Sequence, residues 1–111
     1  MSLILKDGIY HINHAYVPVR IALAGHSSED GTPVIAWSIM DDCLDHLWLI
    51  HAVPGEDVTY TIQNAVSGTY MDMRGSSAAD GTLVIGFQKR TPGENQKWII
   101  RPEASGSGHW K

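Results

Sequence analysis

The sequence predicts an all-β protein that contains two copies of one four-stranded unit. Three observations support this prediction. A shift of 50 positions aligns the first half of the chain with the second half without a gap. Short segments rich in β-branched and aromatic residues alternate with Gly, Pro, Asp and Ser, as they do in chains of short strands. No segment has a sustained helical period.

The internal repeat keeps its register over more than 40 residues. The shift places "GIYHINHA…GHSSEDGTPVIAW…DHLWLI" on "VTYTIQNA…GSSAADGTLVIGF…NQKWII". The residues that coincide are Tyr10 and Tyr60, Ile12 and Ile62, Ala15 and Ala65, Gly25 and Gly75, Ser27 and Ser77, Trp48 and Trp98, and Ile50 and Ile100. Asp30-Gly31-Thr32 likewise falls on Asp80-Gly81-Thr82. Repeat one therefore spans residues 8–51 and repeat two spans residues 58–101.

Each repeat predicts four strands in the same order. The first strand is expected at residues 9–12 and 58–62, the second at 20–23 and 70–73, the third at 33–37 and 83–87, and the fourth at 47–50 and 97–100. Asp30-Gly31 and Asp80-Gly81 predict hairpin turns, because Gly tolerates a positive φ and Asp can accept a hydrogen bond from its own backbone. Trp48 and Trp98 recur in front of apolar residues, which predicts that both belong to the core.

Two such units do not easily close a barrel, whereas three can. A second shift of 50 places Trp110 under Tyr10 and Tyr60, so residues 109–111 are expected to begin a third repeat. We therefore expect residues 1–111 to form one domain that is the front part of a longer protein. The alternative is a short chain that completes its barrel with a second copy, as a homodimer.

Composition narrows the class of protein. The chain has 111 residues, of which 43% are hydrophobic and 18% charged, as in a small globular domain. A net charge of −4 argues against nucleic acid as a partner, and no apolar stretch approaches the roughly 20 residues of a membrane helix. Cys43 is the only cysteine, and the apolar run before Lys6 is too short for a signal peptide, so a cytoplasmic location is expected. His11 and His14 would face opposite sides of a strand, so neither a metal site nor a cofactor is expected.

The repeat has a recognisable form. The segment "SGTYMDM…GTLVIGFQ…NQKWII" resembles the Gln-X-Trp repeat of ricin-B-type β-trefoil lectins, and the whole chain is similar to the trefoil part of mushroom agglutinins. The resemblance implies three repeats in a pseudo-threefold β-trefoil, each able to carry one shallow sugar site. It also implies a non-catalytic protein of fungal defence that binds galactose-type glycans (Gal or GalNAc), sialylated in some cases. Some members carry a C-terminal cysteine-protease-like domain used for dimerisation; that domain is not in this sequence, and its activity is not carried over.

The resemblance assigns a sugar site to the second repeat. In the family a carboxylate lies on the second strand, an aromatic residue ends the third, and an Asn precedes Gln-X-Trp. Asp72, Phe87 and Asn95 occupy these positions, followed by Gln96. We expect Asp72 to accept hydrogen bonds from two ring hydroxyls, Phe87 to stack on the apolar sugar face, and Asn95 to donate to one hydroxyl. Gln96 is expected to brace the loop.

The first repeat keeps the aromatic residue but not the carboxylate. Trp37 aligns with Phe87, Ala22 aligns with Asp72, and Asp45-His46 replaces Asn95-Gln96. Without the carboxylate the paired hydroxyls lose their acceptor, so a degenerate site is expected. Asp45 and His46 could still contact a charged or extended glycan.

The same residues also allow functions other than a sugar site. Asp72 alone could be a solvated strand residue, and Asp72 with Glu94 could imitate a glycosidase pair, although no extended cleft is indicated. Cys43 lies near Asp42 and His46, but its place in a repeat loop favours an ordinary thiol. The main alternative is a protein-interaction module such as a protease inhibitor, which has no need of the Asp72, Phe87 and Asn95 set.

Overall fold

The computed structural model describes residues 5–40 and 44–101, in which every regular element is a strand or a single turn of 3-10 helix. The strands are β1 (Gly8–His11), β2 (Val19–Leu23), β3 (Thr32–Ser38), β4 (Leu47–Ala52), β5 (Thr59–Asn64), β6 (Tyr70–Met73), β7 (Val84–Phe87) and β8 (Trp98–Ile99). The 3-10 turns are η1 (Ala24–His26), η2 (Leu44–His46), η3 (Arg74–Ser76) and η4 (Glu94–Gln96). The all-β class is confirmed, and each predicted strand coincides with an observed one to within two residues at either end.

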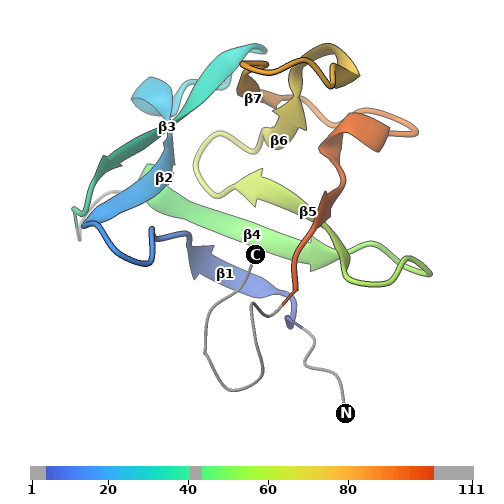
Figure 1. Ribbon diagram of the computed structural model, residues 1–111, viewed down its shortest axis with the longest axis horizontal. Coiled ribbons are helices and arrows are strands. Elements are labelled where there is room, and N and C mark those ends of the chain that lie inside the picture. Colours follow the sequence, from blue (N-terminus) through green and yellow to red (C-terminus); the bar gives the residue numbers. More distant parts are fainter. Residues whose placement is uncertain (1–4, 41–43, 102–111) are drawn as a thin grey trace.

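The strands form one curled antiparallel sheet. Its order is β1-β4-β5-β6-β7-β3-β2, and β8 pairs with β5 beside this path. Figure 1 shows the path bending round so that β2, at one end of the order, comes back towards β1 at the other. A bridge between Asn13 and Arg20 joins the segment after β1 to β2, and the Ile21 N–H donates to the Ile12 carbonyl at 2.8 Å. The strands thus surround a common interior.

The two Asp-Gly pairs lie in turns, as predicted, but they do not join two strands by themselves. Gly31 and Gly81 have positive φ values of 91° and 82°, which Gly adopts without a side-chain clash. The loop between β2 and β3 also contains η1, and the loop between β6 and β7 also contains η3. Each hairpin therefore has a long loop of which Asp-Gly is only the last turn.

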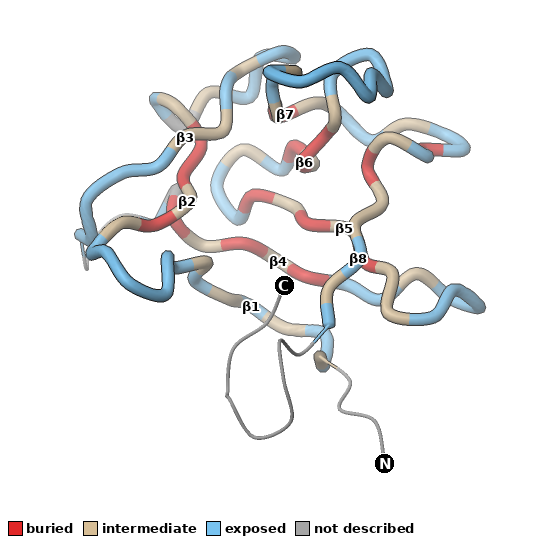
Figure 2. Tube along the Cα trace, in the orientation of Figure 1, coloured by how far each residue is buried: buried red, intermediate tan, exposed pale blue. Residues whose placement is uncertain are grey.

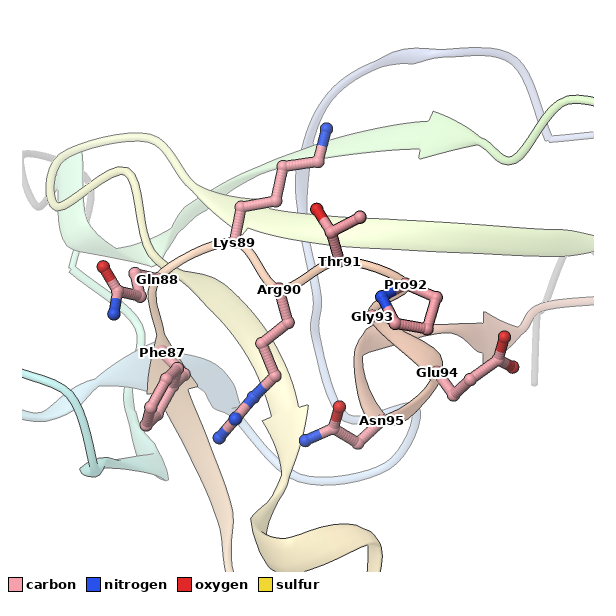
Figure 3. A pocket seen from close by; sticks show the side chains of 9 residues that line it. All are labelled: Phe87, Gln88, Lys89, Arg90, Thr91, Pro92, Gly93, Glu94 and Asn95. Atoms are coloured by element: carbon pink, nitrogen blue, oxygen red, sulfur yellow. The ribbon is translucent and has the colours of Figure 1, made fainter.

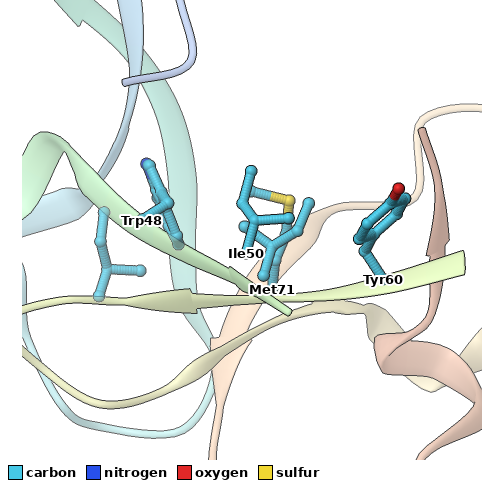
Figure 4. Close-up of a cluster of buried hydrophobic side chains, with 6 residues drawn as sticks. Trp48, Ile50, Tyr60 and Met71 are labelled. Atoms are coloured by element: carbon cyan, nitrogen blue, oxygen red, sulfur yellow. The ribbon is translucent and has the colours of Figure 1, made fainter. Parts of the chain in front are cut away.

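The core lies inside the curl of the sheet. Its buried side chains come from β2, β4, β5 and β6, and they are Leu23, Trp48, Ile50, Tyr60, Ile62 and Met71 (Figures 2 and 4). Trp48 donates its indole N–H to the Ile21 carbonyl at 3.0 Å, and Trp98 donates in the same way to the Met71 carbonyl at 2.9 Å. The two bonds are related by the 50-residue shift, and Trp98 packs against the core cluster. Both Trp predictions are confirmed.

Two sequence-based expectations concern residues outside the described part of the chain. Residues 109–111, which we expected to begin a third repeat, are among them. Cys43 and Asp42 are also outside it.

Candidate functional site

The candidate site of the second repeat is built around a buried carboxylate on β6. Met71 and Asp72 are both buried, although neighbouring residues of a strand point to opposite faces. Met71 belongs to the core cluster, whereas Asp72 hydrogen-bonds with side chains of the segment that follows β7. Asp72 pairs with Ile85 in the ladder between β6 and β7, and this register fixes its position along the strand. Its exposed fraction is 0%.

Three side chains donate hydrogen bonds to the Asp72 carboxylate. Arg90 Nε and Gln96 Nε2 both donate to Oδ2 at 2.9 Å, and Asn95 Nδ2 donates to Oδ1 at 2.8 Å. A charged carboxylate without water is costly unless donors surround it, so these bonds are what makes the burial of Asp72 tolerable. Arg90 also supplies the opposite charge, and its side chain is 38% exposed.

The loop from residue 88 to residue 96 holds those donors in place. Gln96 Nε2 also donates to the Gln88 carbonyl at 2.8 Å, and Gln96 Oε1 accepts from the Arg90 backbone N–H at 3.1 Å. Gly93, with a φ of 74°, precedes η4 and lets the chain turn back so that Asn95 and Gln96 reach Asp72. Gln96 thus braces the loop, as the sequence suggested.

The surface of the site is an open depression of about 500 Å³. It is lined by the continuous segment of residues 87–95, from Phe87 at the end of β7 to Asn95 in η4 (Figure 3). In Figure 3 the Arg90 side chain extends towards Phe87 and Asn95, while Lys89 and Glu94 point away from them. The Arg90 guanidinium carbon lies 3.7 Å from the centre of the half-buried Phe87 ring. Arginine on an aromatic face is a cation–π contact.

The structure brings the four predicted residues of the second repeat together. Phe87 and Asn95 line the depression, whereas Gln96 and Asp72 are buried and do not line it. The arrangement combines an aromatic ring, an amide donor and a carboxylate within hydrogen-bonding reach of that amide. Chemically it suits a small polyhydroxylated ligand, provided that the carboxylate can be uncovered.

Arg90 is the functional candidate that the sequence analysis missed. The repeat contains a signal, because the 50-residue shift aligns Arg90 of repeat two with Met40 of repeat one. The carboxylate and the arginine are therefore both present in repeat two and both absent from repeat one, where Ala22 stands for Asp72. This paired difference agrees with the direct contact between Asp72 and Arg90.

In the first repeat, Trp37 is the exposed residue among the described side chains of the equivalent set. Trp37 is 51% exposed, whereas Ala22 and His46 are buried, with His46 only 1% exposed. The Nδ1 atom of His46 has no hydrogen-bond partner within the described residues. The Asp45 side chain is outside the described set. The structure thus separates Trp37 at the surface from His46 in the interior.

Ion pairs tie the site to its neighbours. Lys97 donates to Glu56 at 2.7 Å, which connects the end of η4 to the loop between β4 and β5. That hydrogen bond raises the pKa of Lys97 above its ordinary value.

Within residues 5–40 and 44–101 no cluster of three or more His, Cys, Asp or Glu residues could hold a metal ion. No helix in the same residues is long and apolar enough to cross a membrane.

Comparison with known proteins identifies the family of the chain. The model of the ricin-type β-trefoil lectin domain-like family matches residues 44–111, which is more than half of the chain. The chain belongs to the ricin-type β-trefoil lectin family. Two solved structures are 46% and 44% identical to this lectin-family chain. One is described as a PSL1a-E64 complex, with a TM-score of 0.76 over 88% of this chain. The other is the Polyporus squamosus lectin bound to the human-type influenza-binding epitope Neu5Acα2-6Galβ1-4GlcNAc, with a TM-score of 0.79 over 98% of this chain.

The β-trefoil fold implied by the resemblance is confirmed by these matches. A designed threefold-symmetric protein, ThreeFoil, is also similar, with 27% identity and a TM-score of 0.79 over 95% of this chain and 71% of its own. This lectin-family chain spans 34% and 37% of the lengths of the two more similar structures. Among curated protein sequences no match is found.

Proposed function

We propose that the chain is a non-catalytic lectin that binds galactose-type glycans through its second repeat. The observation that carries this proposal is that Phe87 and Asn95 line one open depression and that Asn95 donates a hydrogen bond to the buried carboxylate of Asp72. A galactose ring offers an apolar face for Phe87 and vicinal hydroxyls for a carboxylate and an amide. No other side-chain set in the described residues combines these three groups in the pattern of the family.

The ligand class is supported by a relative. The Polyporus squamosus lectin, 44% identical over nearly the whole of this chain, was solved with a sialylated Galβ1-4GlcNAc trisaccharide. We propose the same class, β-galactosides with or without sialic acid, for the second repeat. The first repeat has Ala22 at the position of the carboxylate, so we expect Trp37 to contribute little affinity by itself.

The test is lactose binding by isothermal titration calorimetry, with a glycan array to define the class. We expect Asp72→Asn to abolish measurable binding, because the amide cannot accept charge-assisted bonds worth about 1.5–3 kcal/mol each. Phe87→Ala should weaken binding at least tenfold by removing the stacking surface, and it leaves the hydrogen bonds of Asp72 in place. Asp80→Ala, which removes an exposed carboxylate of the same repeat, serves as the control.

Thermal unfolding of each variant separates lost binding from lost folding. A folded Asp72→Asn variant that binds lactose as the wild type does would refute the assignment of the carboxylate. An array on which the folded wild-type protein recognises no galactoside would refute the ligand class.

A further inference from the structure

Both anchor points of the proposed sugar site are already occupied by the protein itself. Arg90 Nε donates to Asp72 Oδ2 at 2.9 Å, and the Arg90 guanidinium carbon lies 3.7 Å from the centre of the Phe87 ring. These are the carboxylate and the aromatic face that a galactoside would use. Arg90 therefore makes the same two kinds of contact as the proposed ligand. It donates a hydrogen bond to the Asp72 carboxylate, and its guanidinium group lies over the Phe87 ring.

The covering of Asp72 has a direct consequence for binding. The carboxylate has no exposed surface, so a sugar hydroxyl cannot reach it while all three donors stay in place. Asn95 and Gln96 are held by the η4 turn, and Gln96 has further bonds to Gln88 and to the Arg90 backbone. Arg90 is held to Asp72 only by its long side chain, which is 38% exposed. Arg90 and Asn95 each donate one side-chain hydrogen bond to Asp72, and of these two donors Arg90 has the longer side chain, which can reach solvent while its backbone stays in place.

The first repeat offers an internal comparison. Its aromatic residue, Trp37, is 51% exposed, and no cation–π contact with Trp37 is found in the described residues. The position equivalent to Arg90 is Met40, and the position equivalent to Asp72 is Ala22. Arg90 thus occurs in the repeat that has the Asp72 carboxylate and is absent from the repeat that lacks it.

We propose that Arg90 is an internal competitor that closes the second-repeat site and must swing out before a galactoside binds. This inference rests on the proposed galactoside function. When only a fraction of molecules has the open site, the apparent affinity falls by that fraction. Asp72 is buried, but water can reach its carboxylate once the 38% exposed Arg90 side chain leaves, so the cost of opening stays modest and an open fraction of about one tenth is expected.

The test compares lactose binding by the wild type, Arg90→Ala and Arg74→Ala, by isothermal titration calorimetry. Arg90→Ala should bind about tenfold more tightly, which corresponds to about 1.4 kcal/mol. It keeps the backbone hydrogen bond to Gln96, so the loop should retain its shape. Arg74→Ala, which removes an exposed arginine of η3, should bind as the wild type does. Equal or weaker binding by a folded Arg90→Ala variant overturns the proposal, because it makes Arg90 a bystander or a ligand contact.

A second measurement does not depend on the variant. The Arg90 Nε–H should give an exchange-protected NMR signal in the free protein and lose that protection when lactose saturates the site. Protection that persists with bound lactose also overturns the proposal. If neither the wild type nor Arg90→Ala binds lactose while both unfold cooperatively, the galactoside function itself fails.

Discussion

At the scale of single residues, the second-repeat site depends on donors meeting one buried acceptor. Asp72 is tolerated in the interior because Arg90, Asn95 and Gln96 all donate to it. Gln96 has the most demanding position, since its amide nitrogen serves both Asp72 Oδ2 and the Gln88 carbonyl. Its counterpart in repeat one, His46, is equally buried. Strand β2 of that repeat has Ala22 at the position of Asp72, so it offers His46 no side-chain acceptor.

The substitution Gln96→Glu tests this donor role with almost no change of shape. It replaces an N–H donor, 2.9 Å from Asp72 Oδ2, with an oxygen that repels both the carboxylate and the Gln88 carbonyl. We expect the free energy of unfolding at neutral pH to fall by about 2–4 kcal/mol, measured by chemical denaturation. Gln88→Glu makes the same change on an exposed side chain of the same loop and should alter stability by less than about 0.5 kcal/mol. Similar losses for the two variants would contradict the donor role.

At the scale of elements, the loop from residue 88 to residue 96 is as important as the strands it joins. Strand β6 supplies Asp72, but this loop supplies every side chain that bonds to it. The loop turns at Gly93, whose φ of 74° is in the left-handed region. A Cβ atom there would lie 2.7 Å from the Arg90 backbone carbonyl oxygen, which is closer than real Cβ contacts. Gly93 is therefore required twice, for its φ and for the close approach of the backbone.

Gly93→Ala and Gly55→Ala together separate these two requirements. Gly55 has a φ of 78° in the loop between β4 and β5, and an added Cβ would meet no atom within 4 Å. Gly55→Ala should cost about 1 kcal/mol of stability through backbone strain alone. Gly93→Ala should cost about 1–2 kcal/mol more and should also weaken lactose binding, since the loop must shift. Denaturation and calorimetry of both variants provide the comparison, and equal costs would contradict the clash.

The strands were more fully predictable from the sequence than the candidate site was. Each strand was found because the repeat places alternating apolar residues twice, and Trp48 and Trp98 make equivalent hydrogen bonds 50 residues apart. Asp72, Phe87 and Asn95 were found through the family motif. The position of Arg90 was not, because a long side chain has many rotamers and its choice depends on a carboxylate 18 residues earlier. The burial of Asp72 follows from the same loop and was equally hidden.

At the scale of the whole molecule, the first repeat supports the site of the second. Strand β3 of repeat one pairs with β7 of repeat two, where Thr32 faces Gly86 and Pro33 faces Ile85. The Gly31 N–H donates to the Gly86 carbonyl at 2.9 Å in the same region. Asp30, which the sequence indicated as a turn former, also accepts a hydrogen bond from the Gln88 backbone N–H at 2.9 Å. The Asp30 turn of repeat one thus holds Gln88, the first residue of the loop that covers Asp72 in repeat two.

Asp30→Ala tests whether the two repeats are coupled in this way. The variant removes one hydrogen bond between residues 58 positions apart, so unfolding free energy should fall by about 0.5–1.5 kcal/mol. Lactose affinity should fall several-fold as well, because the freed Gln88 end lets the loop drift from Phe87. The matched variant is Asp80→Ala, the same position in repeat two, whose side chain makes no hydrogen bond within the described residues. Asp80→Ala should therefore leave lactose affinity unchanged. If Asp30→Ala leaves lactose affinity unchanged, Asp30 acts only within its own turn, and the second-repeat site is independent of the first repeat.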